Sequence, residues 1–313
     1  LIKGNISFNN DELDDFIIER GDGYPTYNFA VVIDDALMNI THVIRGDDHV
    51  NNTPRQILLY QALGFAVPKF AHVPMILGAD KARLSKRHGA TSVMAYKDMG
   101  FLPEALVNYL VRLGWAHGDQ EIFSLAELME LFTLEAVGKS PAIFNPEKLL
   151  WLNAHYIKEA KTDRLKDEMA PLWPQSAANA DAGFVRKIIA DLQPRAKTLV
   201  ELASLADFYF AETINYENEA GQKFLTPEIA DYIKTIAADI ISLNDFSKEG
   251  IENYLKIFIE KNNIKFKVLA QPLRVALTGK TVSPGIDEIM MTLGKERVIK
   301  RINDAVAYIS GKT

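Results

Sequence analysis

The chain has 313 residues and carries 35 Lys and Arg against 41 Asp and Glu, so its formal net charge is −6 at pH 7. Hydrophobic residues make up 48% and charged residues 24%, which excludes a disordered or collagen-like chain, and the length suits about two domains. The absence of cysteine excludes disulfides and Cys-ligated metals. No apolar run reaches the ~20 residues needed to span a bilayer, so no membrane partner and a cytoplasmic setting are expected.

The first quarter of the chain mixes strand and helix signals. Short β-favouring runs predict strands at residues 16–18, 41–45 and 70–77. Between the last two, Thr53 followed by Pro predicts a helix start, with Thr53 as N-cap and Gln56 as its capping partner. A strand, a helix and a strand within about 35 residues are typical of a βαβ unit, which predicts a parallel sheet.

Beyond about residue 100, apolar residues recur at helical spacing. Stripes of this kind are Leu106/Tyr109/Leu110/Leu113, Ile229/Ile233/Ile236/Ala237/Ile240 and Val298/Ile302/Ala305/Val306/Ile309. Residues 124–127 (Ser-Leu-Ala-Glu) form a capping box. Because no convincing strand follows residue 160, we expect this half to be all-helical, with a surface loop at residues 175–183.

The segment between Gly78 and Gly89 is the most informative about chemistry. It places four cations, Lys81, Arg83, Lys86 and Arg87, directly after an apolar run. A solvated basic turn is one interpretation, and it is the usual one for a charge cluster. The alternative is a mobile loop that contacts phosphates, because phosphoryl and nucleotidyl transfer spread negative charge over phosphate oxygens. The sequence has no Walker A motif, and a dinucleotide fingerprint at residues 21–26 fails because Thr replaces its last Gly.

Residues 83–87 (Arg-Leu-Ser-Lys-Arg) resemble the Lys-Met-Ser-Lys-Ser loop of class I aminoacyl-tRNA synthetases. Further blocks resemble the bacterial glutamyl-tRNA synthetases in particular. These are Gly-Asp-Gly-Tyr-Pro-Thr-Tyr-Asn (21–28), Thr-His-Val-Ile-Arg-Gly-Asp-Asp-His (41–49), Asn-Asn-Thr-Pro-Arg-Gln (51–56), Leu-Pro-Glu-Ala-Leu-Val-Asn-Tyr-Leu (102–110), Leu-Gly-Trp (113–115) and Gln-Pro-Leu-Arg-Val-Ala-Leu-Thr-Gly (271–279). The blocks keep their order over nearly the whole chain.

The resemblance implies an α/β plus all-α fold in three parts. Residues 1–75 correspond to the C-terminal half of a Rossmann-type catalytic domain. Residues 76–160 correspond to a stem-contact connector that carries the loop, and residues 161–313 to a helical anticodon-binding region with a seam near 215–225. The His-Ile-Gly-His-like ATP motif and the acceptor-end insertion have no counterpart in this sequence. We therefore expect a fragment of its enzyme that forms no glutamyl-adenylate alone.

The resemblance also implies an activity, the ATP-dependent ligation of glutamate to tRNA(Glu), with Mg²⁺ accompanying ATP. Lys86 is expected to contact the ATP phosphates, together with Ser85 and Arg83. Arg83 stands where the family usually has Lys, and a planar guanidinium differs from a point ammonium. Asp48 and His49 are expected near the adenosine. Alternatively, Asp47 and Asp48 only interact favourably with the positive N-terminus of the following helix.

Two residues are implied as ligands of glutamate. Arg45 is expected to pair with the substrate carboxylate, a task that suits a bidentate guanidinium. A salt bridge at the end of a strand is the alternative for Arg45. Tyr27 is expected to hydrogen-bond the amino acid, and its alternative is a half-buried aromatic beside a turn. Val31 stands where some relatives carry Asn, so one polar contact to the substrate is expected to be missing.

For tRNA, the resemblance implies contacts from Arg195 and Arg274, at positions where the family recognises the anticodon. Charges on a helix surface are the alternative for both. From residue 261 to residue 301 there are nine Lys and Arg against three acids, which predicts a local basic face for the RNA backbone. The aromatic run at residues 208–210 is expected in the core.

A second hypothesis is a stand-alone tRNA-binding module without catalysis. A glutaminyl relative fits less well, because its anticodon-binding part is expected to be rich in strands. The resemblance favours a monomer, and the sequence shows no cluster of metal ligands, so no protein metal site is expected. Whether tRNA(Gln) is also a substrate stays open at this stage.

Overall fold

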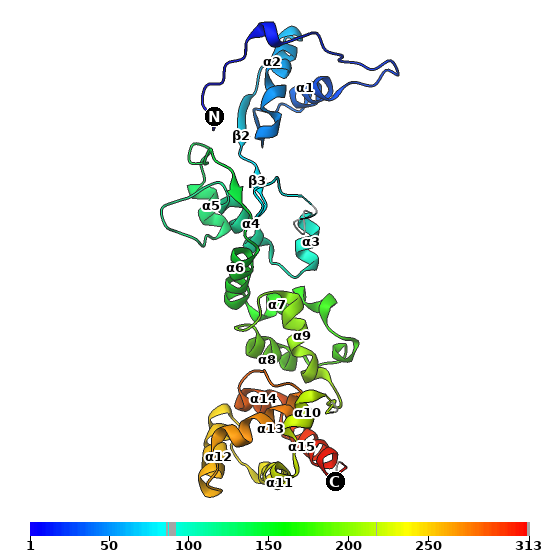
Figure 1. Cartoon of the computed structure of the whole chain (residues 1–313), viewed down its shortest axis with the longest axis vertical. Coiled ribbons are helices and arrows are strands. Elements are labelled where there is room, and N and C mark those ends of the chain that lie inside the picture. The colour runs from blue at the N-terminus through cyan, green and yellow to red at the C-terminus, as the bar shows by residue number, and fades with distance from the viewer. Residues whose placement is uncertain (86, 88–91, 217, 312–313) are drawn as a thin grey trace. The chain divides into compact units, whose positions relative to one another are not determined.

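The computed structural model describes residues 1–85, 87, 92–216 and 218–311, and helices dominate it (Figure 1). These residues form two compact units. The first comprises residues 1–98 and 103–152, and the second comprises residues 99–102 and 153–313 as far as they are described. The division at residue 152 falls inside helix α6 (Pro146–Glu159). The three-part division at residues 75 and 160 stays a prediction.

The predicted βαβ unit is confirmed in the first unit. Strands β1 (His42–Gly46) and β2 (Lys69–Val73) are parallel and in register along their whole length. The 3-10 helix η2 (Asp47–Asn52) and helix α2 (Thr53–Ala62) connect them. Helix α1 (Tyr27–Leu37) packs against α2. This arrangement places the end of β1 directly beside the start of η2, where polar side chains follow one another.

The predicted strand at residues 16–18 is wrong. This segment is irregular, and the nearest pairing is an isolated antiparallel bridge between Glu19 and Pro25. The side chain of Ile17 is 72% exposed. A β-favouring run gains little from pairing when it covers no apolar surface, because strand preference mostly reflects packing.

The predicted strand at residues 70–77 is broken in two by Pro74, which has no N–H to donate to a sheet. Strand β2 ends at Val73. Strand β3 (Ile76–Leu77) instead pairs in parallel with β4 (Ala142–Ile143) in a second small sheet. The two halves of one apolar run therefore serve different sheets.

The first unit contains four more α-helices among its described residues, joined by irregular segments. Its helices are α3 (Val93–Asp98), α4 (Pro103–Arg112), α5 (Leu125–Leu131) and the first part of α6. The capping box of α5 is confirmed, because the Glu127 amide donates to Ser124 Oγ (3.2 Å) and the Ser124 amide donates to Glu127 Oε2 (2.7 Å). A core cluster holds this part to β2; its buried members are Ile2, Ala71, Trp115, Phe123, Leu128 and Val137.

The second unit contains helices alone among its described residues, as predicted. They are α7 (Thr162–Glu168), α8 (Ala182–Leu192), α9 (Leu199–Phe210), α10 (Glu219–Phe224), α11 (Pro227–Ser242), α12 (Lys248–Lys261), α13 (Phe266–Thr278), α14 (Ile286–Leu293) and α15 (Lys295–Ser310), with short 3-10 turns at Ala170–Leu172 and Gln175–Ala177. The five residues of the stripe on α11 are all buried. The predicted surface loop at residues 175–183 is only partly correct, since Ala177 is buried and α8 begins inside it.

Buried Arg301 on α15 connects three helices. Its Nη1 donates to the carbonyl of Leu277 in α13 (2.7 Å), and its Nη2 donates to the carbonyls of Phe208 (2.6 Å) and Ala211 (2.9 Å) at the end of α9. The last carbonyls of a helix lack intrahelical partners and carry partial negative charge. Burial lowers the pKa of Arg301 to about 10, and the guanidinium stays charged at neutral pH.

Candidate functional site

Arg45 lies at the carboxyl end of β1, and all three nitrogens of its guanidinium donate hydrogen bonds. Nη1 donates to Gln56 Oε1 (2.8 Å), and Nε donates to His72 Nε2 (3.3 Å). Nη2 donates to Thr53 Oγ1 (2.8 Å) and to the carbonyl of His49 (3.4 Å). The side chain is half-buried. Its orientation is therefore fixed from three sides while part of it stays accessible.

The partners of Arg45 are all neutral. The two acids that follow it in the chain are held elsewhere: Asp47 Oδ2 lies 2.9 Å from Lys3 Nζ, and Asp48 Oδ2 lies 3.1 Å from Arg83 Nη2. Across the described residues, no ion pair of Arg45 is formed. The alternative of a salt bridge at the strand end is thus not what the structure has, and the described residues place no carboxylate partner on Arg45.

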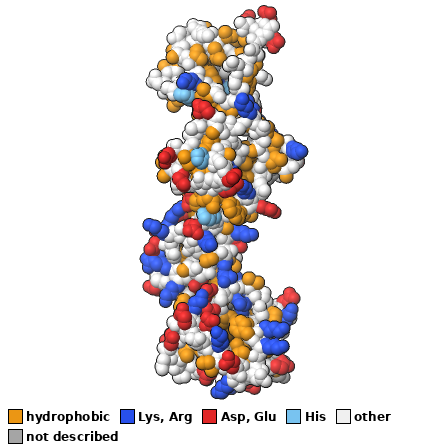
Figure 2. Space-filling model, turned by 90° about the vertical axis from the view of Figure 1, so that its left-hand side faces the viewer, with side chains coloured by type: hydrophobic (Ala, Val, Ile, Leu, Met, Phe, Trp, Pro, Cys, Tyr) orange, Lys and Arg blue, Asp and Glu red, His pale blue; other side chains and the backbone are white. Residues whose placement is uncertain are grey.

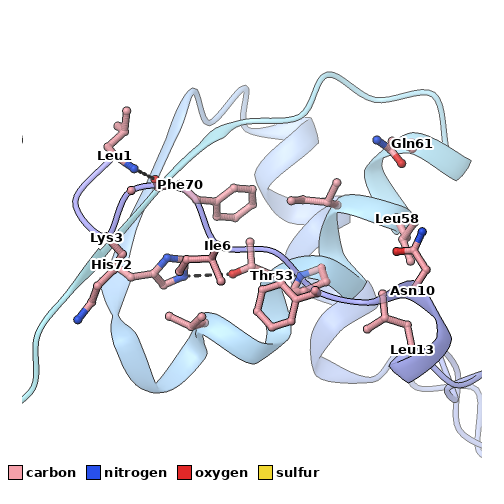
Figure 3. Close-up of a pocket in the computed structure, with 15 residues that line it drawn as sticks. Leu1, Lys3, Ile6, Asn10, Leu13, Thr53, Leu58, Gln61, Phe70 and His72 are labelled. Atoms are coloured by element: carbon pink, nitrogen blue, oxygen red, sulfur yellow. Dashed lines mark hydrogen bonds between the residues drawn. The ribbon is translucent and has the colours of Figure 1, made fainter.

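His72 and Thr53 complete the surroundings of Arg45. Burial and the charge of Arg45 lower the pKa of His72, which favours a neutral ring with Nε2 as acceptor. The Thr53 hydroxyl lies 3.1 Å from the same nitrogen. As Figure 3 shows, both residues also line a cavity of about 430 Å³, together with the N-terminal segment and Phe70. The Phe70 ring centroid lies 5.5 Å from Arg45 Cζ.

Tyr27 and His49 lie beside this arrangement. Tyr27 is the first residue of α1, and its side chain is 52% exposed. Its hydroxyl lies 3.3 Å from His49 Nδ1, and Asn52 Nδ2 lies 3.2 Å from the same nitrogen. Because the carbonyl of His49 also accepts from Arg45, the two residues predicted to bind glutamate meet through His49.

Arg83, predicted for ATP, contacts Asp48, predicted for the adenosine. A tight turn after β3 carries Arg83 there: Leu77 and Arg83 form an antiparallel bridge, and the Leu84 amide donates to the Ile76 carbonyl (2.9 Å). Lys81 within the turn has φ +60°, in the left-handed region. Ser85 follows and is half-buried. Lys86 lies outside the described residues.

Gly46 allows this pairing. A side chain at position 46 would place its Cβ 2.5 Å from Asp48 Oδ1, closer than any real contact. Only the missing Cβ of glycine lets the Asp48 carboxylate lie against the backbone at the end of β1.

Sequence reasoning assigned the wrong role to Thr53 and Gln56. The predicted N-cap Thr53 is the first residue of α2, the cap position is Asn52, and no side chain caps this helix end. Both side chains bind Arg45 instead. His72 was missed altogether. A polar residue in an apolar strand was the available signal, since a buried polar group needs a partner.

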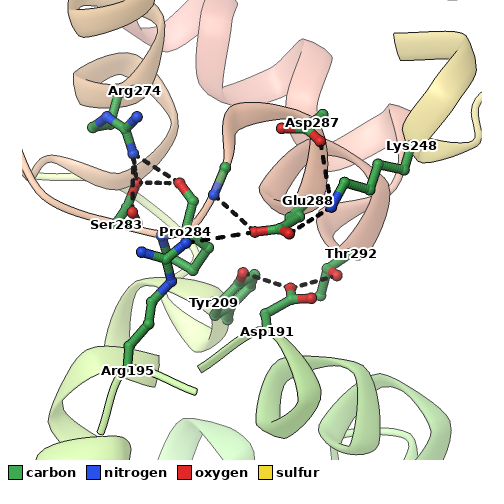
Figure 4. A network of polar contacts seen from close by, with 11 residues as sticks. Asp191, Arg195, Tyr209, Lys248, Arg274, Ser283, Pro284, Asp287, Glu288 and Thr292 are labelled. Atoms are coloured by element: carbon green, nitrogen blue, oxygen red, sulfur yellow. Dashed lines mark hydrogen bonds and ion pairs between the residues drawn. The ribbon is translucent and has the colours of Figure 1, made fainter. Parts of the chain in front are cut away.

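In the second unit, the structure brings Arg195 and Arg274 close together (Figure 4). Arg274 on α13 donates through Nη1 to the Ser283 hydroxyl, to the Ser283 carbonyl (3.2 Å) and to the Pro284 carbonyl (2.8 Å). Burial lowers the pKa of Arg274, and the nearby charge of Arg195 lowers it further. Two like charges at close range favour an anionic or acceptor ligand between them.

Glu288 on α14 balances part of this charge. It accepts from Lys248 Nζ (2.7 Å) and from the Gly285 amide (2.9 Å), and Arg195 Nη2 lies 3.9 Å from its Oε2. The hydrogen bond from Lys248 is the main cause that lowers the pKa of Glu288. Arg195 keeps 49% of its side chain exposed, so it is oriented but accessible.

The predicted basic face between residues 261 and 301 is smaller than its composition suggested. Arg301 is only 2% exposed and cannot contact RNA, and Lys300 pairs with Asp304 (2.8 Å). Figure 2 shows side chains of both charge signs interspersed over the second unit on the face in view. The aromatic run at residues 208–210 is buried, as expected.

Two further features bear on possible ligands. Among the described residues, no group of three or more His, Asp or Glu side chains is arranged to hold a metal ion. In the same part of the chain, no helix has the length and apolar character needed to cross a membrane.

Two family models match the chain. One, for the catalytic domain of class I tRNA synthetases (E and Q), matches residues 1–151, and an anticodon-binding domain model matches residues 161–306. The glutamate–tRNA ligase 1 of Syntrophus aciditrophicus is 68% identical over 99% of this chain and 66% of its own length. The glutamate–tRNA ligase of Geobacter sulfurreducens is 58% identical over the same shares. The chain thus spans about two thirds of these relatives.

Two solved structures that resemble this chain are also glutamate–tRNA ligases. A crystal structure of a glutamate tRNA ligase from Elizabethkingia meningosepticum, in complex with its amino acid, superposes with a TM-score of 0.84 at 32% identity. It covers 98% of this chain, which in turn covers 65% of that structure. The glutamate-tRNA synthetase from Elizabethkingia anophelis gives a TM-score of 0.80 at 31% identity.

Proposed function

Because this chain belongs to the family of glutamate–tRNA ligases, we propose that its gene product joins glutamate to tRNA(Glu) at the expense of ATP. A glutamate carboxylate oxygen attacks the α-phosphorus of ATP, which forms glutamyl-adenylate and releases pyrophosphate. The terminal ribose hydroxyl of the tRNA then attacks the acyl carbon, and AMP leaves. This chain supplies part of the first site and the tRNA-binding helices.

The observation that carries the proposal is the uncompensated guanidinium of Arg45. A carboxylate that approaches its accessible side meets a charge whose orientation is already fixed by neutral acceptors. Tyr27 lies near enough to act through the same neighbour, His49, and its exposed hydroxyl provides a second polar contact for the amino acid. Together they form a small polar site for a zwitterionic substrate.

For ATP, we propose that Lys86, Arg83 and Ser85 contact the phosphates and that Asp48 and His49 lie near the adenosine. The ion pair between Arg83 and Asp48 supports this, because it joins the loop to the end of β1. Mg²⁺ would neutralise phosphate charge when bound with ATP. No set of three protein ligands for it exists among the described residues, so the ion would be held mainly by the nucleotide.

For tRNA, we propose that Arg195 and Arg274 contact the anticodon bases. Single-stranded bases expose acceptors on their edges, and a guanidinium held in place can bind or stack on them. The like charges of the two arginines and the accessible side of Arg195 support this assignment. We further propose a monomer in the cytoplasm.

The experiment is glutamate-dependent exchange of pyrophosphate into ATP by the whole gene product, with and without Arg45→Ala. We expect Arg45→Ala to raise the KM for glutamate at least ~10-fold, because a charged hydrogen bond to the substrate is lost. The KM for ATP should stay within about twofold of the wild-type value. An equal rise in the KM for glutamate and the KM for ATP would argue against a role of Arg45 in binding the glutamate carboxylate. A protein that binds tRNA but shows no exchange would favour the alternative, a non-catalytic tRNA-binding module.

A further inference from the structure

Gln56 is the more buried of the two buried partners of Arg45, with 2% of its surface exposed against 7% for His72. Its amide orientation is determined by its two partners. The oxygen accepts from Arg45 Nη1 (2.8 Å), and the nitrogen donates to Asn28 Oδ1 (2.9 Å). If the amide were flipped, its NH₂ group would face the Arg45 donor and its oxygen would face the Asn28 oxygen.

Buried arginines ordinarily pair with a carboxylate, because an unpaired buried charge is costly. Here the acids closest in sequence, Asp47 and Asp48, are each taken by another cation, and the buried position opposite Nη1 holds an amide. The chain thus provides hydrogen bonds for the guanidinium without providing a counter-charge. A glutamate at position 56 would have nearly the same size and would cancel the charge.

We infer that Gln56 is a positioning residue that holds Arg45 while leaving its charge for the substrate, and so determines selection of a carboxylate over a neutral group. Thr53 and His72 hold the other two nitrogens in the same neutral manner. This inference rests on the proposed function, because it requires that Arg45 bind the glutamate carboxylate.

The geometry separates this role from a purely structural one. If Gln56 only stabilised the fold, then Gln56→Glu would keep the bond to Arg45 and strengthen it by charge, would lose the donor to Asn28 Oδ1, and would leave substrate binding intact. If Gln56 preserves the charge, the same change neutralises Arg45 and leaves the substrate carboxylate facing a second, fixed carboxylate. If Gln56 preserves the charge, Gln56→Glu should therefore keep the thermal stability of the protein while it weakens glutamate binding.

The test compares Gln56→Glu, Gln56→Met and the wild type in the whole gene product. The control is Gln61→Glu, an exposed position on the same helix. We expect Gln56→Glu to raise the KM for glutamate ~100-fold with an unchanged KM for ATP, and with no loss in Tm because the new ion pair with Arg45 offsets the lost bond to Asn28. Gln61→Glu should behave as wild type. Gln56→Met should raise the KM for glutamate ~10-fold, since the charge remains but one contact is lost.

Selectivity provides the second measurement. The preference for glutamate over an analogue with one carboxylate replaced by an amide should fall at least ~10-fold in Gln56→Glu but not in Gln56→Met, because only the first removes the charge. Should Gln56→Glu fail to fold because its carboxylate faces Asn28 Oδ1, Gln56→Met decides the question, and a wild-type KM for glutamate in Gln56→Met would overturn the inference.

Arg45→Ala distinguishes a failure of the proposed role of Arg45 from a failure of the inference about Gln56. If Arg45→Ala leaves the KM for glutamate unchanged, the proposed role of Arg45 fails. If Arg45→Ala raises it and Gln56→Glu does not, the role of Arg45 stands and the inference about Gln56 is wrong.

Discussion

Arg83 Nη2 lies 3.1 Å from Asp48 Oδ2, and this ion pair joins the turn after β3 to the first residues after β1. Both partners are accessible, with 67% and 31% of their side chains exposed. Such pairs contribute at most about 1 kcal/mol to stability. The pairing therefore matters for what the two residues can contact rather than for the fold.

The first prediction concerns this pair. Asp48→Asn should release Arg83 and raise the KM for ATP several-fold, while the free energy of unfolding changes by less than ~1 kcal/mol. Urea unfolding and pyrophosphate exchange measure the two quantities. The control is Asp22→Asn, which breaks the exposed pair with Arg20 and should change neither. A double-mutant cycle with Arg83→Ala that shows no coupling for ATP would refute the prediction.

The second prediction concerns pH and His72, whose pKa is lowered by burial and by Arg45. In the unfolded chain His72 binds a proton near pH 6.5, but in the folded protein it does so only at lower pH. Between these two values the unfolded state holds more protons, so the contribution of His72 to stability is complete above pH 6.5 and declines as the pH falls.

His72→Gln removes that titration. The difference in unfolding free energy between wild type and His72→Gln should therefore shift against the wild type as the pH falls below 6.5. Denaturant unfolding at several pH values measures it. Glutamate binding by the wild type should weaken only at the lower pH at which the folded protein protonates His72, because a protonated His72 repels Arg45 and no longer accepts from its Nε. A difference that is constant with pH would contradict the assignment.

The third prediction concerns Arg301, which donates to three carbonyls at helix ends. Arg301→Met keeps the apolar stem but leaves these carbonyls without donors, and we expect a loss of about 2–5 kcal/mol. Arg297→Met is the matched control: Arg297 is exposed on the same helix and lies 4.4 Å from the Phe184 ring, so its loss should be at most ~1 kcal/mol. Equal effects of the two changes would show that the buried contacts add nothing.

The fourth prediction concerns Arg195 and Arg274. Arg274→Ala should reduce discrimination between the cognate anticodon and a changed anticodon by ~10-fold or more, with little change in pyrophosphate exchange. Arg195→Ala should have a smaller effect, because this side chain is half exposed and only loosely held by Glu288. The measurement is the affinity of each variant for tRNAs that differ by single anticodon bases, at one fixed salt concentration. An unchanged preference in Arg274→Ala would count against the anticodon assignment.

Much of the fold could be predicted from local patterns. The βαβ unit, the capping box before α5 and the apolar stripe on α11 follow from periodicity and from residues a few positions apart. Local patterns failed where distant residues decide the outcome. Thr53 matched a capping pattern, but a hydrogen bond to the charged Arg45 displaced that local use.

For the candidate site, family resemblance suggested Tyr27, Arg45, Asp48, His49 and Arg83. It did not indicate the contacts of Arg45 with Gln56 and His72, which depend on how β1, α2 and β2 pack. The basic count between residues 261 and 301 failed for a related reason. Composition records the charge of Arg301 but not its burial, and a buried Arg serves the backbone rather than RNA.

The contacts of Arg301 also have a consequence for synthesis on the ribosome. The carbonyl of Phe208 is made 93 residues before its donor. At ~5–20 residues per second, the end of α9 waits roughly 5–20 s before the guanidinium that binds it has been translated. During that interval the carbonyls at the end of α9 lack the donor that they have in the folded structure. We therefore expect the end of α9 to be joined to α13 through Arg301 only after α15 has been made.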